Sequence, residues 1–252
     1  MPGLDRDIAE HHIPMYPEVR PVKQKLRRLR PEWAEKIREE IAKQIQANFL
    51  EVVDYPQWLA NIVPVSKKDG KVRMCVDFRD LNKACPKYDF PLPYTNVIIN
   101  SATSSAMYSF MDGFSGYNQI MMAVMDKIKT AFITEWGTYC YKVMPFGLKN
   151  AGATYQRAAT ALFHDMMHKE VEVYVDDMMV KSKIREGHFE ALDKFLARLE
   201  KYNLRLNPKK FVFGVTSGKL LGHRVSERGI EVDIDKIKTI QEMPVPKTKK
   251  DV

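Results

Sequence analysis

Two adjacent acidic residues, Asp176 and Asp177, lie between two apolar runs. The runs, residues 171–175 and 178–181, have the alternation and β-branching that predict the two strands of a hairpin. Adjacent carboxylates repel each other, so a rigid hairpin that presents both at one place is a suitable support for a cation site. Taken alone, the two acids would serve equally well as ordinary turn residues.

A third acidic residue, Asp112, ends a strand predicted over Met107–Asp112. If this strand lies beside the hairpin, three carboxylates converge and need a cation to neutralise them. Mg²⁺ suits such a site because it takes oxygen ligands and keeps coordination positions for phosphates, and Mn²⁺ is a second candidate. Two such ions about 3.5–4 Å apart can stabilise both the attacking and the leaving oxygen in phosphoryl transfer.

The composition is that of a folded globular chain of one large domain or two small ones, with 252 residues, 45% hydrophobic and 29% charged. No stretch approaches the roughly 18–20 apolar residues of a membrane span, so no membrane partner is expected. The net charge of +8 favours a polyanionic partner, most often nucleic acid. The three cysteines form no CxxC pair, which indicates reduced thiols inside the cell.

Helices and strands are mixed without strict βαβ alternation, which predicts an α+β fold. After an extended arm over residues 1–30, Pro31 is expected to open a helix. Hairpin turns are expected at Asp69-Gly70 and at Trp136-Gly137. Asn150 is a candidate helix N-cap. A later helix is expected to bury an apolar face of Phe189, Leu192, Phe195, Leu196 and Leu199.

Several long motifs follow one another in a characteristic order: residues 72–83, 110–120, 130–134, 143–157, 173–177, 206–210 and 220–223. In these stretches the sequence resembles the reverse transcriptases of gypsy-type LTR retrotransposons, most closely those of plants. The likeness runs from about residue 22 to residue 243. A series of long motifs in the correct order is far more specific than any one of them.

The resemblance implies a right-hand polymerase fold with fingers and palm, and with the thumb essentially absent. After the arm, the expected fingers are residues 31–90 and 121–146. The expected palm is residues 91–120 and 147–235, including the Tyr-Val-Asp-Asp hairpin and a turn like a primer grip. Residues 236–252 would begin a truncated thumb or connection. We expect the chain to be a fragment of a longer polyprotein that extends primers weakly.

The same resemblance implies roles for individual residues. Asp112, Asp176 and Asp177 correspond to the catalytic triad that binds two Mg²⁺ ions. Lys67 and Arg73 correspond to fingers residues that contact the triphosphate, and a guanidinium can grip phosphate in a bidentate way.

Further contacts to the nucleotide and the primer are implied. Tyr117 corresponds to the bulky residue under the incoming sugar, where a ring would clash with a 2′-hydroxyl; a buried core tyrosine is the alternative. The nucleotide is also expected beside the backbone of Ser115 and Gly116, and beside the Phe146-Gly147 loop. The expected primer contacts are Leu220, Leu221, Gly222 and His223.

The implied function is RNA-directed DNA polymerase, acting with an RNA template, a DNA primer–template duplex and dNTPs. The implied location is intracellular, either the cytoplasm within a virus-like particle or the nucleus. One alternative is a weak or silent remnant that only binds nucleic acid. Another is an RNA-templated RNA polymerase, against which Tyr117 argues.

A third alternative is a zinc hydrolase. His164 and His168 are spaced almost as in HExxH. Helical geometry argues against a zinc site, because both histidines would lie opposite the buried stripe of their helix, and no third ligand follows at the usual spacing.

Overall fold

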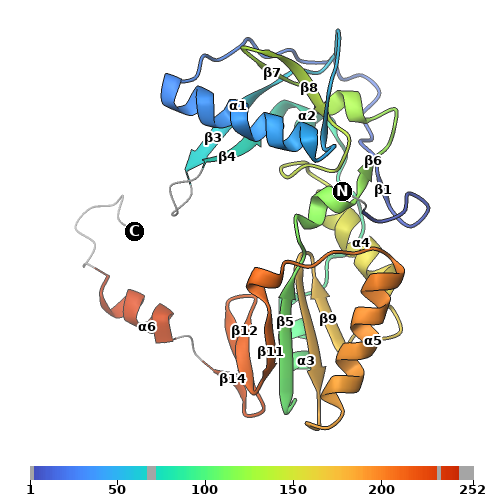
Figure 1. The fold of residues 1–252 in the computed structure, drawn as a ribbon, viewed down its shortest axis with the longest axis vertical. Coiled ribbons are helices and arrows are strands. Elements are labelled where there is room, and N and C mark those ends of the chain that lie inside the picture. Colours follow the sequence, from blue (N-terminus) through green and yellow to red (C-terminus); the bar gives the residue numbers. More distant parts are fainter. Residues whose placement is uncertain (1–2, 67–71, 232–233, 244–252) are drawn as a thin grey trace. The chain divides into compact units, whose positions relative to one another are not determined.

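A computed structural model describes residues 3–66, 72–231 and 234–243 of the chain (Figure 1). The chain divides into two compact units, and neither is one continuous segment. The first comprises Met1–Leu92, Gly113–His164 and Ala197–Asn207, and the second comprises Pro93–Asp112, Asp165–Leu196 and Pro208–Val252. Both mix helices and strands, as the α+β prediction requires. The subdomain boundaries expected for fingers and palm stay a prediction.

The first unit contains a five-stranded sheet in the order β2-β8-β7-β3-β4. Ser66 pairs with Val72 in the predicted β3–β4 hairpin, whose turn at residues 67–71 lies outside the described residues. Thr134 pairs with Gly137, so the β7–β8 hairpin turns at Glu135-Trp136, one residue earlier than predicted. The strands are β2 (Leu50–Val52), β3 (Ala60–Ser66), β4 (Val72–Val76), β7 (Phe132–Thr134) and β8 (Gly137–Tyr141).

Helix α1 (Pro31–Gln46) packs against β2 and β4 of this sheet (Figure 1). Pro31 occupies the first helical position, as predicted. Ile37 and Ile41, one turn apart, are buried and form the contact face, whereas Ile45 near the end of the helix is exposed. The first unit also contains α2 (Arg79–Ala84), η1 (Gly116–Gln119), β6 (Met121–Met122), η2 (Lys127–Thr130) and α4 (Ala151–Phe163).

The N-terminal arm is extended and anchored to the first unit. Its one strand, β1 (Glu10–His11), pairs in parallel with β6. His11 is buried, with Nδ1 2.9 Å from Oγ1 of Thr154 in α4. Burial lowers the pKa of His11 to about 4, so the ring is neutral at pH 7. The part of the arm up to Ile13 therefore packs into the core, whereas residues 14–30 are mostly exposed.

Asn150 lies at the N-cap of α4, but its side chain makes no capping hydrogen bond. Its carbonyl oxygen accepts from the backbone N–H of Tyr88 at 3.0 Å, and its amide donates to the carbonyl of Pro86 at 3.0 Å. The predicted position was correct and the predicted capping role was wrong. Tertiary bonds to the segment that follows α2 replace the local capping bond.

The second unit is built on a four-stranded antiparallel sheet in the order β11-β5-β10-β9. A second sheet joins β12, β13 and β14. The elements are α3 (Thr95–Ala102), β5 (Met107–Asp112), β9 (Val171–Tyr174), β10 (Asp177–Ser182), α5 (His188–Lys201, in this unit up to Leu196), η3 (Pro208–Lys210), β11 (Val212–Val215), β12 (Ser217–Leu220), β13 (His223–Ser226), β14 (Gly229–Glu231) and α6 (Ile234–Gln241).

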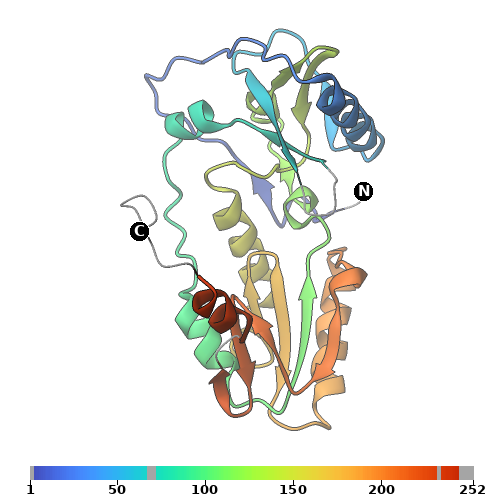
Figure 2. The same cartoon turned by 90° about the vertical axis from the view of Figure 1, so that its left-hand side faces the viewer.

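Helices α3 and α5 cover opposite faces of the four-stranded sheet (Figure 2). Side chains alternate along a strand, so Tyr108 and Ser109 of β5 point to opposite faces. Tyr108 packs in one cluster with Ile98 and Ile99 of α3. Ser109 instead bonds to His188 of α5, with 2.7 Å between Oγ and Nε2.

His188 links three strands from the α5 side of the sheet. Its Nδ1 lies 3.0 Å from Oγ of Ser182 in β10. Ser109 Oγ also accepts from the backbone N–H of Gly214 in β11, at 3.2 Å. Burial lowers the pKa of His188, which favours the neutral ring. The buried face of α5 is His188, Ala191, Phe195 and Leu199, whereas Phe189 and Leu196, which we predicted to be buried, are exposed.

A buried ion pair holds β9, β10 and α3 together on the other face. Lys181 Nζ lies 2.8 Å from Glu172 Oε1, and the two side chains are 4% and 0% exposed. The Ser101 hydroxyl donates to Glu172 at 2.6 Å, and His168 Nδ1 lies 2.9 Å from the other carboxylate oxygen. Each charge therefore has the partners that a buried charge requires.

No helix in the described ranges is long and apolar enough to cross a membrane.

We predict that Lys181→Met lowers the free energy of unfolding by about 3–5 kcal/mol, because it leaves the Glu172 carboxylate buried without its cation. Urea denaturation measures this change. The double variant Glu172→Leu/Lys181→Met should regain most of the loss, since no lone charge remains. The exposed pair of Lys194 and Glu190, 3.0 Å apart, supplies the control, and Lys194→Met should not change the urea midpoint. A Lys181→Met protein as stable as the unmodified chain would contradict the prediction.

Candidate active site

The register of the second unit's sheet places Asp112 directly opposite Asp177. The two residues are Cα partners across β5 and β10, and Asp177 also pairs with Tyr174 of β9. Directly opposed residues in an antiparallel pair point to one face with Cβ atoms about 4.5–5.5 Å apart. Backbone hydrogen bonding alone therefore brings two of the three predicted carboxylates together.

Asp176 occupies the two-residue turn between β9 and β10, next to Val175. Val175 has φ +52°, in the left-handed region that β-branched residues rarely adopt. The position is one where tight hairpin turns normally use glycine or asparagine. This strained turn carries the second acidic residue to the end of the sheet where Asp112 and Asp177 lie. Strained backbone of this kind persists where the surrounding structure enforces it, often at functional sites.

The three carboxylates oppose one another's ionisation. Burial, followed by the charges of Asp112 and Asp177, raises the pKa of Asp176 to about 6. Burial and the charge of Asp112 also raise the pKa of Asp177. These are the shifts expected where like charges are held close together in a partly desolvated place.

Lys210 partly compensates this repulsion. It ends η3, just before β11, and its ammonium pairs with Oδ2 of Asp112. Its charge lowers the pKa of both Asp176 and Asp177, against the larger effect of burial. The role of Lys210 could not be predicted from the sequence, because only the pairing of β11 with β5 brings it to Asp112.

The aspartates fit a hard divalent cation by their chemistry. Within the described part of the chain, no donor lies within hydrogen-bonding distance of the buried Oδ1 of Asp176. An unsatisfied carboxylate oxygen beside two further carboxylates is a ligand set that suits Mg²⁺. Among the described residues, however, no three His, Cys, Asp or Glu side chains already have the spacing of a metal site. The carboxylates need side-chain rearrangement to share an ion.

The predicted nucleotide-binding residues belong to the first unit, and three of them form a stack. The ring centroids of Tyr117 and Phe146 are 4.6 Å apart. The guanidinium carbon of Arg73 lies 6.0 Å from the Phe146 centroid. Tyr155, buried in α4, contacts Tyr117 edge-on with centroids 5.8 Å apart. The Tyr117 ring thus contacts both a core tyrosine and a half-exposed phenylalanine.

The remaining predicted contacts are also located. Ser115, the N-cap residue of η1, has φ +49°, and Gly116, the first residue of η1, is buried. Gly147 has φ +95°, and its carbonyl accepts from the side-chain amide of Asn82 at 2.8 Å. Lys67 lies outside the described residues.

The predicted primer-contact residues form a second tight hairpin in the second unit. Leu220 pairs with His223 across β12 and β13, which leaves Leu221 and Gly222 as the turn. Both have positive φ, +48° and +80°. A two-residue turn of this kind is easily made by glycine but strained at leucine. Leu220 is buried, and Leu221 packs against the cluster that contains Tyr108.

The two histidines of the zinc alternative do not share a helix. Helix α4 ends at Phe163, so His164 and His168 both follow it. His168 has φ +63° and bonds to Glu172. The helical arrangement that HExxH chemistry needs is absent from this described segment.

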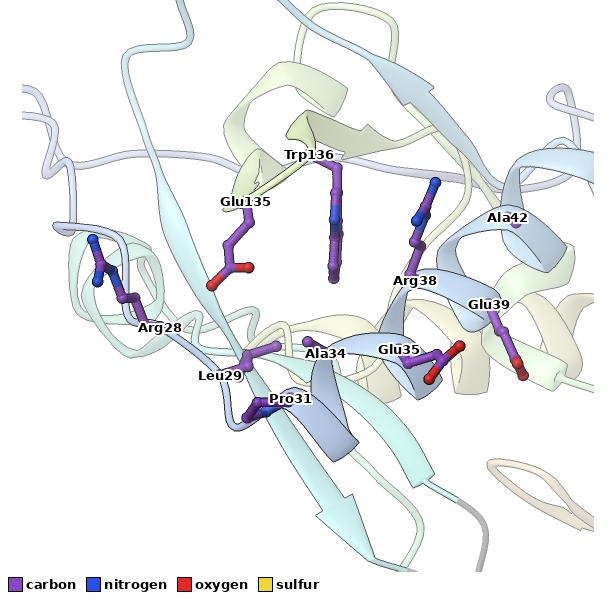
Figure 3. Close-up of a pocket in the computed structure, with 10 residues that line it drawn as sticks. All are labelled: Arg28, Leu29, Pro31, Ala34, Glu35, Arg38, Glu39, Ala42, Glu135 and Trp136. Carbon is purple, nitrogen blue, oxygen red and sulfur yellow. The ribbon is translucent and has the colours of Figure 1, made fainter.

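A hollow of about 760 Å³ in the first unit contains none of the predicted site residues (Figure 3). Figure 3 shows the Trp136 ring between the side chains of Glu135 and Arg38. Three carboxylates and two guanidinium groups line the hollow, so it offers no consistent charge to a polyanion. The lining residues are Arg28, Leu29, Pro31, Ala34, Glu35, Arg38, Glu39, Ala42, Glu135 and Trp136.

The fold is that of the template-directed polymerases. A foamy viral protease-reverse transcriptase in complex with an RNA/DNA hybrid matches 96% of this chain and 32% of its own with a TM-score of 0.85 at 21% identity. A form of that protein in complex with double-stranded DNA matches 98% of this chain and 45% of its own, also with a TM-score of 0.85 and 21% identity. The chain belongs to the reverse transcriptase family, because the family model "Reverse transcriptase (RNA-dependent DNA polymerase)" matches residues 65–225.

Curated relatives confirm the retrotransposon type. The Pol polyprotein of transposon opus from Drosophila melanogaster is 36% identical over 197 residues, covering 78% of this chain and 20% of the polyprotein. That of transposon gypsy from the same fly is 34% identical over 174 residues, covering 69% and 17%. The chain therefore spans about a fifth of the length of these relatives. The plant-like affinity stays a prediction.

We predict that Asp176→Asn raises the melting temperature of the metal-free protein at pH 7–8 by about 2–4 °C, allowing for partial solvent exposure of the carboxylate. Because the folded pKa of about 6 lies above the ordinary 3.8, ionising Asp176 destabilises the folded state as pH rises between them. The gain should be complete above pH 6 and vanish near pH 4. Thermal melts in EDTA measure it.

The exposed acid Asp54 supplies the matched control, and Asp54→Asn should leave the melting temperature unchanged at both pH values. Added Mg²⁺ should stabilise the unmodified chain more than Asp176→Asn. An Asp176→Asn gain that is equal at pH 4 and pH 8 would show that the carboxylate is not under repulsion.

Proposed function

We propose that this chain is the polymerase core of a retrotransposon reverse transcriptase, which adds deoxynucleotides to a primer 3′-hydroxyl under the direction of an RNA or DNA template. The observation that carries the proposal is the convergence of Asp112 and Asp177 on one sheet face, with the unsatisfied oxygen of Asp176 beside them. Family membership supports it.

Asp112, Asp176 and Asp177 would hold the divalent metal on which the family generally depends, and Mg²⁺ is the ion that their oxygen ligands favour. Such ions, when bound, activate the primer hydroxyl and neutralise charge on the triphosphate. The chain's own contribution is to fix three carboxylates on a rigid sheet end. Lys210 adds a positive charge at the same place.

The first unit's residues would select and orient the nucleotide. Arg73, exposed on β4, can grip a phosphate with its planar guanidinium. Tyr117, held by Phe146 and Tyr155, would meet a 2′-hydroxyl and so favour deoxynucleotides. Lys67 is proposed as a second phosphate contact on the resemblance alone, together with the Ser115, Gly116 and Gly147 backbone.

RNA and DNA duplexes are the proposed macromolecular partners. The two foamy viral structures that this chain resembles are complexes with an RNA/DNA hybrid and with double-stranded DNA. The net charge of +8 favours such a polyanion. The Leu221–Gly222 turn is proposed to contact the primer end.

We predict that the purified chain extends a DNA primer on poly(rA) with Mg²⁺ and dTTP, and that Asp112→Asn, Asp176→Asn or Asp177→Asn lowers incorporation at least about 100-fold. Asp54→Asn serves as the control and should extend the primer normally. If incorporation by each of these three single variants equals that of the unmodified chain, the protein is a remnant that only binds nucleic acid.

We predict that Tyr117→Ala raises ribonucleotide relative to deoxynucleotide incorporation by about 10–100-fold, because a steric check on one hydroxyl is lost. Phe146→Leu should have a smaller effect in the same direction, since the Tyr117 ring loses its stacking partner. Phe146→Tyr, which keeps a ring at this position, is the matched control. Single-nucleotide incorporation with dGTP and GTP gives the ratio. An unmodified chain that uses both equally would instead indicate an RNA polymerase.

A further inference from the structure

The ring of Phe110 in β5 occupies the space that a side chain at position 218 in β12 would fill, and residue 218 is a glycine. A Cβ added to Gly218 would fall on Cε2 of Phe110 and lie 2.5 Å from Cζ and 2.8 Å from Cδ2. Real Cβ atoms are not found so close to ring carbons. Gly218 does not have a left-handed φ, so close approach, and not backbone conformation, is what requires glycine here.

The Phe110 ring has little freedom to move aside. It stacks on Tyr108 with centroids 6.0 Å apart and planes 20° from parallel. Tyr108 is fully buried, and its hydroxyl donates to the carbonyl of Ala102 in α3 at 2.9 Å. Phe110 also packs against the buried cluster that includes Met179 and Leu220. A side chain at position 218 would therefore displace β12 sooner than the ring.

The contact joins two strands, β5 and β12, that carry different parts of the candidate site. Phe110 and Asp112 point to the same face of β5, two residues and about 6.7 Å apart along the strand. Gly218 lies three residues before Leu221 in the hairpin whose turn is Leu221–Gly222. One close contact thus connects the aspartate-bearing strand to the proposed primer-contact turn.

We propose that Gly218 is a positioning residue for nucleotide addition. Because residue 218 has no side chain, β12 packs directly on the Phe110 ring. This packing sets the position of the Leu221–Gly222 turn relative to the Asp112 end of the sheet. The proposal rests on the proposed function, since it assumes that this turn holds the primer end. A displaced turn would misplace the primer hydroxyl, and a displacement of about 1 Å can cost about 100-fold in rate.

The expected pattern separates rate from nucleotide binding. Gly218→Ala should lower kcat for single-nucleotide addition by about 10–100-fold and change the KM for dNTP by less than about threefold. The residues proposed to bind the nucleotide, Arg73 and Tyr117, belong to the first unit, whereas Gly218 belongs to the second. General unfolding would lower the folded fraction but leave kcat per folded molecule unchanged, so kcat is expressed per folded molecule.

The decisive test is a compensating substitution on the full chain. Phe110→Val removes the ring atoms that a Cβ at 218 would meet and keeps a side chain suited to a strand. The variants are Gly218→Ala, Phe110→Val and the double variant, assayed with Mg²⁺, a DNA primer on poly(rA) and dTTP. The double variant should match Phe110→Val within about threefold and exceed Gly218→Ala clearly.

Gly187→Ala is the matched control. It adds the same methyl group in the same unit, where a Cβ would meet Ile184 Cγ1 at 3.4 Å, an ordinary contact. Its kcat should equal that of the unmodified chain. A normal kcat for Gly218→Ala, or a double variant no better than Gly218→Ala, overturns the proposal. Should Gly218→Ala fail to fold, a folded and active double variant supports it, and an unfolded double variant overturns it.

Binding separates failure of this proposal from failure of the proposed function. Fluorescence anisotropy with a labelled primer–template gives the Kd of each variant without chemistry. If the unmodified chain binds but does not extend, Gly218→Ala should still weaken binding, and adding Phe110→Val to it should restore binding. The absence of this pattern overturns the positioning role. If the unmodified chain neither binds nor extends, the proposed function falls, and the positioning role falls with it.

Discussion

The repulsion among three carboxylates is the interaction around which the second unit is organised. Asp112 and Asp177 are opposed by strand register, and Asp176 follows in the turn. Burial, followed by the charges of Asp112 and Asp177, raises the pKa of Asp176 to about 6, so this place opposes negative charge in the absence of a cation. Such a cluster persists only on a support that cannot relax. Helix α3 covers one face of the sheet with apolar side chains and a buried ion pair, and α5 secures the other through His188.

Both hairpins of this unit that carry predicted site residues have a bulky residue where the backbone conformation favours glycine. Val175 precedes Asp176 in one turn, and Leu221 precedes Gly222 in the other. Each has a left-handed φ that costs of order 1–3 kcal/mol. Sheet pairing on both sides of each turn enforces the conformation. The two turns are therefore held by their strands and not by their own sequence, which is why single-residue turn preferences do not reveal them.

Part of the framework could be predicted from sequence, because strand alternation and Pro31 act locally: β5 and the start of α1 were predicted at their observed positions. The convergence of Asp112 with the hairpin needed a pairing that periodicity does not supply, and the family motifs supplied it. Lys210 was missed because its partner is distant in sequence. Phe189 was wrongly predicted to be buried, because the helical period fits a buried face that includes either Phe189 or His188. Histidine is less often buried than phenylalanine, yet here His188 is the buried residue. The Gly218–Phe110 contact depends on inter-sheet distance, which no local pattern encodes.

The pairing of Lys210 with Asp112 also bears on the order in which the chain is made. All three acidic residues emerge from the ribosome before Lys210, which comes just ahead of the edge strand β11. The last strand to join the sheet thus brings its own counter-charge to the strand beside it. Pairing of β11 with β5 and partial compensation of the acidic end are therefore coupled, because one short segment of the chain supplies both the strand and the positive charge.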